Sequence, residues 1–247
     1  MAAPTVRDTD ADWRRIGEAQ PYWGVLSGER YRIENIDEAA LNDFYGSGQG
    51  DIQAVVERAS RFLGAWPAPR RALDFGCGVG RLVYAMTPYA EEVVGYDVSP
   101  EMLSKAESRN AESLNNGHVR FTSAWPKGGF DWINSYIVFQ HIPPQRGLEL
   151  LEKLLGQLNP GGLVSLHFTV YRDARLEPTP RPYAAALKLV KQCLGRPTEP
   201  PAGSVSMFDY DLSKILAALV RGGVSESAML HLDHNGHHGV QIIGRRG

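Results

Sequence analysis

The sequence predicts an α/β domain built on an open, mostly parallel sheet, and three features of the 247-residue chain indicate it. Short apolar runs of strand character alternate with helical stretches between residues 70 and 170. A glycine-rich turn follows the first run, and Asn235-Gly236 separates two strand-like runs near the carboxyl end. Alternation at this spacing predicts parallel strands with helices on both faces, and an Asn-Gly pair is a strong hairpin signal.

The overall composition is that of an ordinary globular protein. Hydrophobic residues make up 43% of the chain, charged residues 22%, and the formal net charge is −2. This near-neutral balance gives no electrostatic reason to expect nucleic acid or an acidic membrane surface as a partner. The chain has only two cysteines, no apolar leader after Met1 and no apolar run long enough to span a bilayer. We therefore expect a cytoplasmic protein without disulfides.

Residues 1–69 are expected to form a helical segment that packs on the sheet as a lid. The stretch GSGQGD, residues 46–51, predicts a loop whose Asp51 caps the next helix. Apolar residues from Ile52 to Leu63 recur at helical spacing. Trp23 lies in an aromatic-rich part of this segment, which could cover a ligand or mediate a homodimer.

The core of the fold is expected over residues 70–170. Strands are predicted at 71–76, 92–97, 118–124, 130–139 and 163–170, with helices at 81–87, 99–109 and 148–158. Ser99 and Pro100 suit the cap and first position of a helix, while the NPGG stretch at 159–162 should end one.

The carboxyl-terminal part is expected to depart from this alternation before returning to it. Residues 171–210 are rich in proline and predict an insertion with one helix at 183–193. A last helix at 211–220 and the hairpin should complete the domain within 211–247.

The strongest chemical signal is the turn LDFGCGVG at residues 73–80. Its glycines permit unusual backbone angles and allow a ligand to lie against the chain. Arg81 occupies the place of the third glycine in the dinucleotide fingerprint G-x-G-x-x-G, which disfavours an NAD-dependent oxidoreductase. Asp97 ends the second predicted strand, where a carboxylate suits the hydroxyl groups of a ribose.

Four sequence blocks in register resemble the class I S-adenosylmethionine-dependent methyltransferases. The blocks are LDFGCGVGRL (73–82), VVGYDVSPEML (93–103), FDWINSYIVFQHIPP (130–144) and LNPGGLVSLHF (158–168). The resemblance implies a Rossmann-like, doubly wound sheet of seven strands with an antiparallel last strand. It also implies S-adenosylmethionine as the cofactor.

The resemblance carries roles onto particular residues of this chain. It implies that Asp74 lies near the cofactor's amino group, that Asp97 holds the ribose, and that Val98 and Met102 flank the adenine. The full set of expected cofactor-binding residues is Asp74, Gly76, Cys77, Gly78, Gly80, Asp97, Val98, Met102, Ser123, Ala124, Ser135, Tyr136 and Trp23. Ser123-Ala124 stands where the family often has Asp-Ala, so adenine recognition there is expected to use the backbone.

Histidines supply the candidates for a general base. His141 follows the fourth predicted strand, and His237 and His238 follow the hairpin turn, which should face the ligand-binding edge of the sheet. Histidines here favour O-methylation of a hydroxyl on a small molecule or carbohydrate. The plain structural alternatives are packing for His141 and a polar turn for the other two.

A metal site in the histidine-rich stretch HLDHNGHHGV is disfavoured by strand geometry. Side chains alternate along a strand, so His234 should point away from the face that His231 and Asp233 share. We therefore assign no metal ligands. The alternatives left open are N-methylation, an NAD-dependent oxidoreductase, a binding subunit without activity and a metal-dependent hydrolase.

Overall fold

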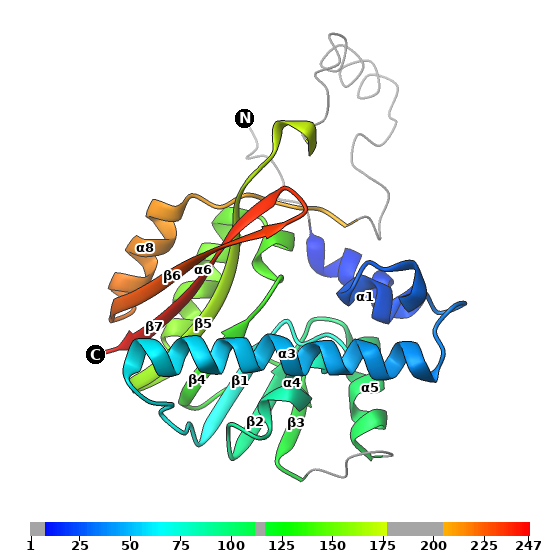
Figure 1. The fold of residues 1–247 in the computed structure, drawn as a ribbon, viewed down its shortest axis with the longest axis horizontal. Coiled ribbons are helices and arrows are strands. Elements are labelled where there is room, and N and C mark those ends of the chain that lie inside the picture. Colours follow the sequence, from blue (N-terminus) through cyan, green and yellow to red (C-terminus); the bar gives the residue numbers. More distant parts are fainter. Residues whose placement is uncertain (1–7, 112–116, 177–204) are drawn as a thin grey trace.

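The computed structural model describes residues 8–111, 117–176 and 205–247, and it contains a seven-stranded sheet in the order β3-β2-β1-β4-β5-β7-β6 (Figure 1). The strands are β1 (Arg71–Phe75), β2 (Glu92–Tyr96), β3 (Val119–Thr122), β4 (Phe130–Ser135), β5 (Leu158–Arg172), β6 (Val224–His234) and β7 (His237–Arg246). The first five strands pair in parallel, and β7 lies antiparallel between β5 and β6. The predicted doubly wound sheet with an antiparallel last strand is confirmed.

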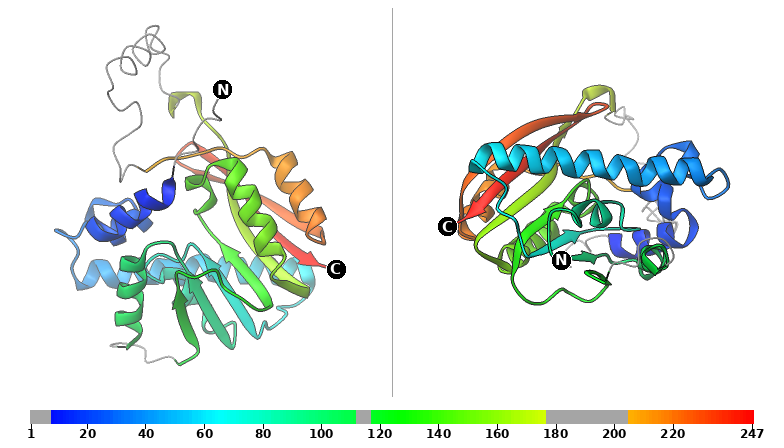
Figure 2. Two further views of the ribbon diagram at one scale, coloured as in Figure 1. Left: turned by 180° about the vertical axis from the view of Figure 1, so that it is seen from behind. Right: turned by 60° about the horizontal axis from the view of Figure 1, so that its bottom comes forward.

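Helices cover both faces of this sheet (Figures 1 and 2). One face carries α3 (Glu38–Leu63), α4 (Arg81–Met86) and α5 (Pro100–Arg109), and the other carries α6 (Pro144–Leu155) and α8 (Leu212–Arg221). Each face has its own apolar core: Ile52 and Trp132 are buried in the first, and Leu151 and Phe168 in the second. Burial of apolar surface on both faces explains why the central strands are almost continuously hydrophobic.

The amino-terminal segment adds a third, smaller cluster beside the sheet. It comprises α1 (Thr9–Ala19), α2 (Pro21–Val25) and a 3₁₀ turn, η1 (Glu29–Tyr31), before α3 begins. Ile16 of this segment and Phe44 of α3 pack with Val79 and Met102 of the core. The predicted helical segment therefore docks directly on the edge where the glycine-rich turn lies.

The loop predicted at residues 46–51 is wrong, because α3 runs unbroken through GSGQGD. Asp37 caps this helix by accepting from the N–H of Ala40 at 2.7 Å. Gly48 is required by close packing, since a Cβ there would come within 2.6 Å of the Arg81 carbonyl oxygen. Tertiary packing of a long amphipathic helix thus overrides the weak helix propensity of glycine.

Two element boundaries also differ from the prediction. Strand β4 ends at Ser135, and a 3₁₀ turn, η3 (Phe139–His141), follows where the strand was expected to continue. The NPGG stretch lies inside β5, which begins at Leu158. The helix predicted at 183–193 lies outside the described residues, as does most of the predicted insertion.

The carboxyl-terminal hairpin turns at Asn235-Gly236, as predicted. The β7 residue His237 pairs with Arg172 at the carboxyl end of β5 and with His234 across the turn. Both turn residues have positive φ, 57° for Asn235 and 91° for Gly236. The turn therefore lies at the edge where parallel strands end, although it projects beyond them.

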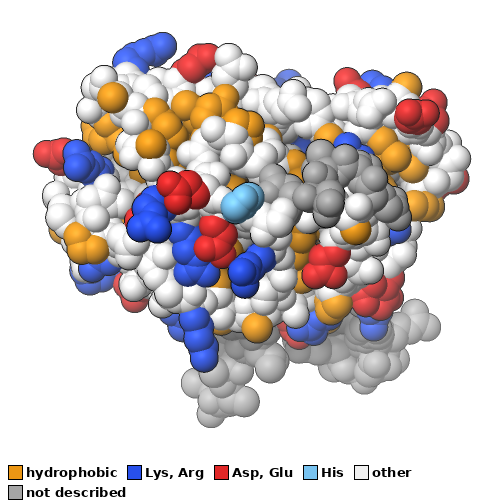
Figure 3. Space-filling model, turned by 90° about the horizontal axis from the view of Figure 1, so that it is seen from below, with side chains coloured by type: hydrophobic (Ala, Val, Ile, Leu, Met, Phe, Trp, Pro, Cys, Tyr) orange, Lys and Arg blue, Asp and Glu red, His pale blue; other side chains and the backbone are white. Residues whose placement is uncertain are grey.

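The opposite edge, where the parallel strands begin, presents a mixture of charges (Figure 3). Arg70 pairs with Glu91 at 3.5 Å and Arg71 with Glu92 at 3.2 Å on this side. No helix within the described ranges is long and apolar enough to cross a membrane.

Candidate cofactor and active site

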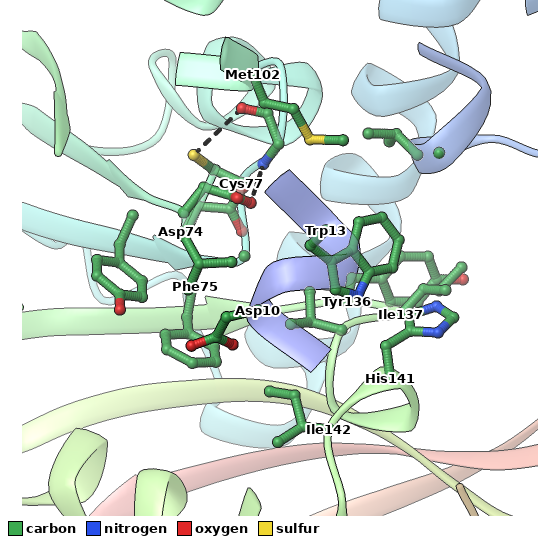
Figure 4. A pocket seen from close by; sticks show the side chains of 18 of the residues that line it. Asp10, Trp13, Asp74, Phe75, Cys77, Met102, Tyr136, Ile137, His141 and Ile142 are labelled. Carbon is green, nitrogen blue, oxygen red and sulfur yellow. Dashed lines mark hydrogen bonds between the residues drawn. The ribbon is translucent and has the colours of Figure 1, made fainter. Parts of the chain in front are cut away.

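A cavity lies over the carboxyl ends of β1, β2 and β4, beneath helix α1 (Figure 4). Most of the predicted cofactor-binding residues line it, namely Asp74, Gly76, Cys77, Gly78, Asp97, Val98, Met102 and Tyr136. The carboxyl edge of an open parallel sheet is where such folds bind their ligands. The local sequence signals therefore converge on one cavity.

The glycine-rich turn forms the floor of this cavity. Gly76 and Cys77 donate their backbone N–H groups to the Tyr96 carbonyl oxygen at 2.8 and 3.0 Å, which ties the turn to the end of β2. Gly76 has a φ of 79°, and a Cβ on it would come within 2.5 Å of the Val138 side chain. The turn can hold this shape only with glycine at position 76.

Asp97 connects the turn to the start of α5. One carboxylate oxygen accepts from the Gly78 N–H at 2.8 Å and the other from the Ser99 N–H at 2.9 Å. Ser99 in turn caps α5 by accepting from the Met102 N–H at 3.3 Å. Burial raises the pKa of Asp97, while the hydrogen bonds from Ser99 and Gly78 oppose that rise. Asp97 therefore fixes both walls of the groove and keeps lone pairs available for hydroxyl groups.

Asp74 brings a second buried carboxyl group to the cavity. Asn134 donates to it at 2.8 Å, and the Ser165 hydroxyl donates to Asn134 at 2.6 Å. Burial raises the pKa of Asp74 to about 7. A carboxyl group poised in this way can be charged by the approach of a cation, so it suits an ammonium group of a ligand.

Helix α1 closes the cavity from above, and this contribution was not predicted at the level of residues. Thr9, Asp10 and Trp13 line the cavity, and Arg146 of α6 meets Asp10 in a two-point ion pair of 2.9 and 2.6 Å. Trp13 packs edge-on against His141 with ring centroids 5.0 Å apart. No local motif marks Asp10 or Arg146, because their meeting depends on how α1 docks on α6.

His141 lines the cavity, but both of its ring nitrogens are engaged. Nδ1 lies 2.8 Å from the Ser206 carbonyl oxygen, and Nε2 lies 3.1 Å from the Gln140 side-chain nitrogen. The Thr169 hydroxyl donates to the Gln140 oxygen at 2.8 Å, which turns the Gln140 NH₂ group toward His141. This network assigns the proton to Nδ1. Burial lowers the pKa of His141 to about 4, so the ring is neutral near pH 7.

A second histidine reaches the cavity wall through Tyr136. The Tyr136 hydroxyl lies 3.3 Å from Nε2 of His234, which is the last residue of β6. His167 packs against both rings, with centroids 5.3 Å from Tyr136 and 5.1 Å from His234. The sequence pattern names His234 only as a possible metal ligand. Its contact with Tyr136 could not be predicted, because it depends on how the hairpin packs beside β4.

His238 is bound elsewhere, whereas His237 pairs with His234 across the turn and lies near enough to His141 and His234 for its charge to lower the pKa of both. His238 stacks on Tyr171 and His231, and its Nε2 lies 2.9 Å from an Asp173 carboxylate oxygen. Neither His237 nor His238 is among the described residues that line the cavity. Their assignment as bases stays a prediction. The described residues also contain no cluster of three or more His, Cys, Asp or Glu side chains suited to a metal ion.

The remaining predicted binding residues surround the cavity without lining it. These are Gly80, Ser123, Ala124, Ser135 and Trp23. Ser135 is buried and donates to the Phe75 carbonyl oxygen at 3.0 Å. Ser123 and Ala124 are exposed after β3. Trp23 instead packs under the Arg32 guanidinium, whose central carbon lies 4.7 Å from the ring centroid.

The fold and this cavity define a Rossmann-like domain with a ligand-sized cavity at the carboxyl edge of its sheet. Residues 72–162 match a family described as a methyltransferase domain. The chain therefore contains a methyltransferase domain, and its sheet has the class I, Rossmann-like topology that the sequence blocks predicted.

Two curated relatives illustrate the sequence similarity. The chain is 36% identical over 150 residues to a trans-aconitate 2-methyltransferase of Methylobacterium radiotolerans, covering 55% of each chain. It is 30% identical over 122 residues to a ubiquinone biosynthesis O-methyltransferase of Xanthomonas campestris pv. campestris, covering 47% of each. The chain thus spans about half the length of the curated relatives it matches.

The solved structures share the fold at lower sequence identity. The magnesium protoporphyrin IX methyltransferase of Synechocystis PCC 6803 with bound SAH superimposes with a TM-score of 0.64 at 18% identity, over 97% of this chain and all of that one. The N-methyltransferase NodS of Bradyrhizobium japonicum WM9 gives a TM-score of 0.57 at 12% identity, over 97% of this chain and 99% of its own. At these identities the likeness supports the fold alone.

Proposed function

We propose that this chain is an S-adenosylmethionine-dependent methyltransferase that methylates an oxygen atom of a small-molecule or carbohydrate acceptor. The observation that carries the proposal is Asp97, whose two oxygens bind the N–H groups of Gly78 and Ser99 at the edge of the cavity. This arrangement holds a glycine floor, a ribose-binding carboxylate and the helix α5 in one rigid unit. Asp74 supplies the complementary charge for an ammonium group.

The shape of the cavity fits this cofactor. The floor at Gly76 and Gly78 presents backbone without side chains, so a ligand can approach it closely. Apolar side chains of Val98 and Met102 stand beside the ribose-binding carboxylate, where a flat purine can pack. The bound sulfonium would supply an already activated methyl group.

The protein's task is then to position the acceptor and exclude water. Tyr136, Ile137 and His141 form the wall that follows β4, and Trp13 covers it from α1 (Figure 4). Holding two reactants in line can supply several kcal/mol of the barrier reduction, on the order of 7–11 kcal/mol in the best oriented systems. Closure by α1 keeps the site dry while this alignment is held.

Oxygen is favoured as the acceptor atom for two reasons. Of the relatives matched above, one is named a trans-aconitate 2-methyltransferase and the other an O-methyltransferase of ubiquinone biosynthesis. The wall also offers a path for the proton of a hydroxyl group, from the acceptor to Tyr136 and from Tyr136 to His234. His141 could accept this proton only after the Gln140 amide turns away from Nε2.

Small acceptors are favoured over macromolecular ones. The cavity is roofed by α1, and the net charge of −2 offers no attraction for phosphate backbones or acidic membranes. A homodimer formed through the amino-terminal segment and a cytoplasmic location stay untested predictions.

The test is to measure release of S-adenosylhomocysteine from S-adenosylmethionine with a panel of acceptors. The panel should include trans-aconitate, a catechol, a neutral sugar and an amino sugar. We expect turnover with an acid or hydroxyl acceptor, and no turnover in Asp97→Ala. Turnover with the amino sugar alone would establish N-methylation instead. A thermal shift with NADH but none with S-adenosylmethionine would contradict the proposal.

A further inference from the structure

Helix α1 crosses the cavity from α6 to α5 and touches both sides of it. At its start Asp10 pairs with Arg146 of α6. One turn later Arg14 donates to the Val98 carbonyl oxygen at 3.3 Å. Near its end Gly17 packs so closely on α5 that an added Cβ would overlap the Ser99 hydroxyl. The helix therefore lies along the part of the cavity that follows β2.

The Asp10 carboxylate lies at this end of the cavity, within electrostatic range of β2. It contributes to raising the pKa of Asp97 and is the leading charge that raises the pKa of Tyr96. Figure 4 shows the Asp10 side chain beside Phe75. Asp10 thus lies near enough to the carboxylate assigned to the ribose to act on its charge.

Three acidic residues among those described line the cavity, and two already have assignments. Asp74 lies beside the β1 end, and Asp97 uses both oxygens to hold the groove. Ser123 and Ala124, which stand where related sequences often place a carboxylate for the adenine, are exposed and do not line the cavity. Asp10 is left as the carboxylate that can face the edge of a purine.

The geometry points to Asp10 as the acceptor of a hydrogen bond from the 6-amino group of the cofactor's adenine, with Arg146 as its positioning residue. This inference rests on the proposed cofactor. The two bonds from Arg146 occupy two of the roughly four lone-pair positions of a carboxylate, which leaves others for an N–H donor. The Asp10 carboxylate in this ion pair is a charged acceptor, so the bond to the adenine would be charge-assisted.

Helix α1 would then distinguish between purines through Asp10. A purine with the 6-amino group would bind Asp10 and hold α1 closed, whereas a purine without it would leave that oxygen without its partner. Purine identity and closure of the acceptor site are then coupled through one side chain.

A double-mutant cycle between protein and ligand tests this. Calorimetric titration would compare S-adenosylhomocysteine with its analogue carrying hydrogen in place of the 6-amino group, in wild type, Asp10→Ala and Asp10→Asn. In wild type we expect the analogue to bind about 10-fold to 100-fold more weakly, the range of a hydrogen bond to a charged group. The ratio should fall to near one in Asp10→Ala and to an intermediate value in Asp10→Asn.

Asp8→Asn is the matched control, because Asp8 lies on the same helix end and caps it by accepting from the Asp10 N–H at 3.0 Å. It removes the same charge and can still cap, so it should keep the wild-type ratio. Equal weakening of both ligands in Asp10→Ala, or a wild-type ratio near one, would overturn the inference and leave Asp10 as a tether for α1. Failure of wild type to bind either ligand would instead overturn the proposed cofactor. Circular dichroism of each variant verifies that it is folded.

Discussion

Two regions along the ligand-binding edge of the sheet carry equally dense motifs in the sequence, yet they behave differently. The glycine-rich turn at residues 73–80 lines the cavity and shapes its floor. In the histidine-rich hairpin at residues 231–240, His238 instead lies within hydrogen-bonding distance of His231 and Asp173. Motif density therefore indicates function only when the backbone register brings the residues to the cavity.

Register explains the difference. Tyr136 follows Ser135, which pairs with Leu166, whereas His237 pairs with Arg172 further along β5. The six residues from His167 to Arg172 correspond to roughly 20 Å of strand. The tip of the hairpin therefore extends past the β4 end, and His234 reaches back to contact Tyr136.

The largest expected effect comes from exchanging one glycine in each of these two regions. Gly76→Ala combines a strained φ of 79° with contacts of 2.5 Å to Val138, so it should cost several kcal/mol and abolish binding of S-adenosylhomocysteine. Gly236→Ala has a φ of 91° but mostly meets the ends of flexible side chains, so it should cost about 1–2 kcal/mol. Chemical denaturation and calorimetric titration measure both effects. Loss of binding in Gly236→Ala would remove the distinction between the glycine-rich turn and the hairpin.

The next effect is a pH dependence of cofactor binding that originates at the turn. Because burial raises the pKa of Asp74 to about 7, the carboxyl group is protonated below that pH and cannot pair with an ammonium group. Affinity for S-adenosylhomocysteine should therefore fall as the pH drops below about 7, by up to about 10-fold per unit, and level off above it. Asp74→Asn should bind weakly with a flat profile. An unchanged profile in that variant would assign the dependence to another group.

A smaller effect is expected on the free energy of unfolding at low pH, and it comes from the buried His167. Burial lowers the pKa of His167 to about 3, from an ordinary value of 6.5. As the pH falls below 6.5 the unfolded chain takes up a proton before the folded one does. The free energy of unfolding should therefore decrease from pH 6.5 toward pH 3, by up to about 1.4 kcal/mol per unit for this group. His141, with a pKa of about 4, adds a similar decrease over its own range.

His167→Leu tests the share of His167 directly. The two ring nitrogens of His167 have no hydrogen-bond partner in the described structure, so an apolar side chain should cost little at pH 8. The acid slope of the melting temperature should become shallower in this variant. An unchanged slope would show that folding does not lower the pKa of His167.

The smallest effect is expected at the hairpin tip. His238→Ala removes a stacked ring and a partly exposed contact with Asp173, so it should cost about 1 kcal/mol or less and leave cofactor affinity unchanged. If His238 were the general base, turnover would instead fall by about 10²–10⁴-fold. The same comparison applies to His237→Ala.

Much of the fold could be predicted from the sequence because its signals are local. Apolar runs, the Ser99 cap and the Asn235-Gly236 turn each fix a short segment, and the glycine turn with Asp97 locates the cavity. The continuity of α3 could not be predicted, because packing at Gly48 outweighs local propensity.

The roof of the cavity could not be predicted at the level of residues either. Asp10 and Arg146 are 136 positions apart, and the residues next to them in the sequence do not predict the ion pair. The contact of Tyr136 with His234 likewise spans 98 positions and depends on the sheet order.

The most direct test is a calorimetric titration of the chain with S-adenosylhomocysteine, in wild type, Asp97→Ala and Asp233→Ala. The two aspartates are matched, since Asp233 also accepts from a backbone N–H, that of Gly236 at 2.6 Å. We predict binding in wild type and Asp233→Ala and a loss of at least about 100-fold in Asp97→Ala, because the ribose contact and the groove are lost together. Absence of binding in wild type, or equal binding in Asp97→Ala, would contradict the assignment of this cavity to the cofactor.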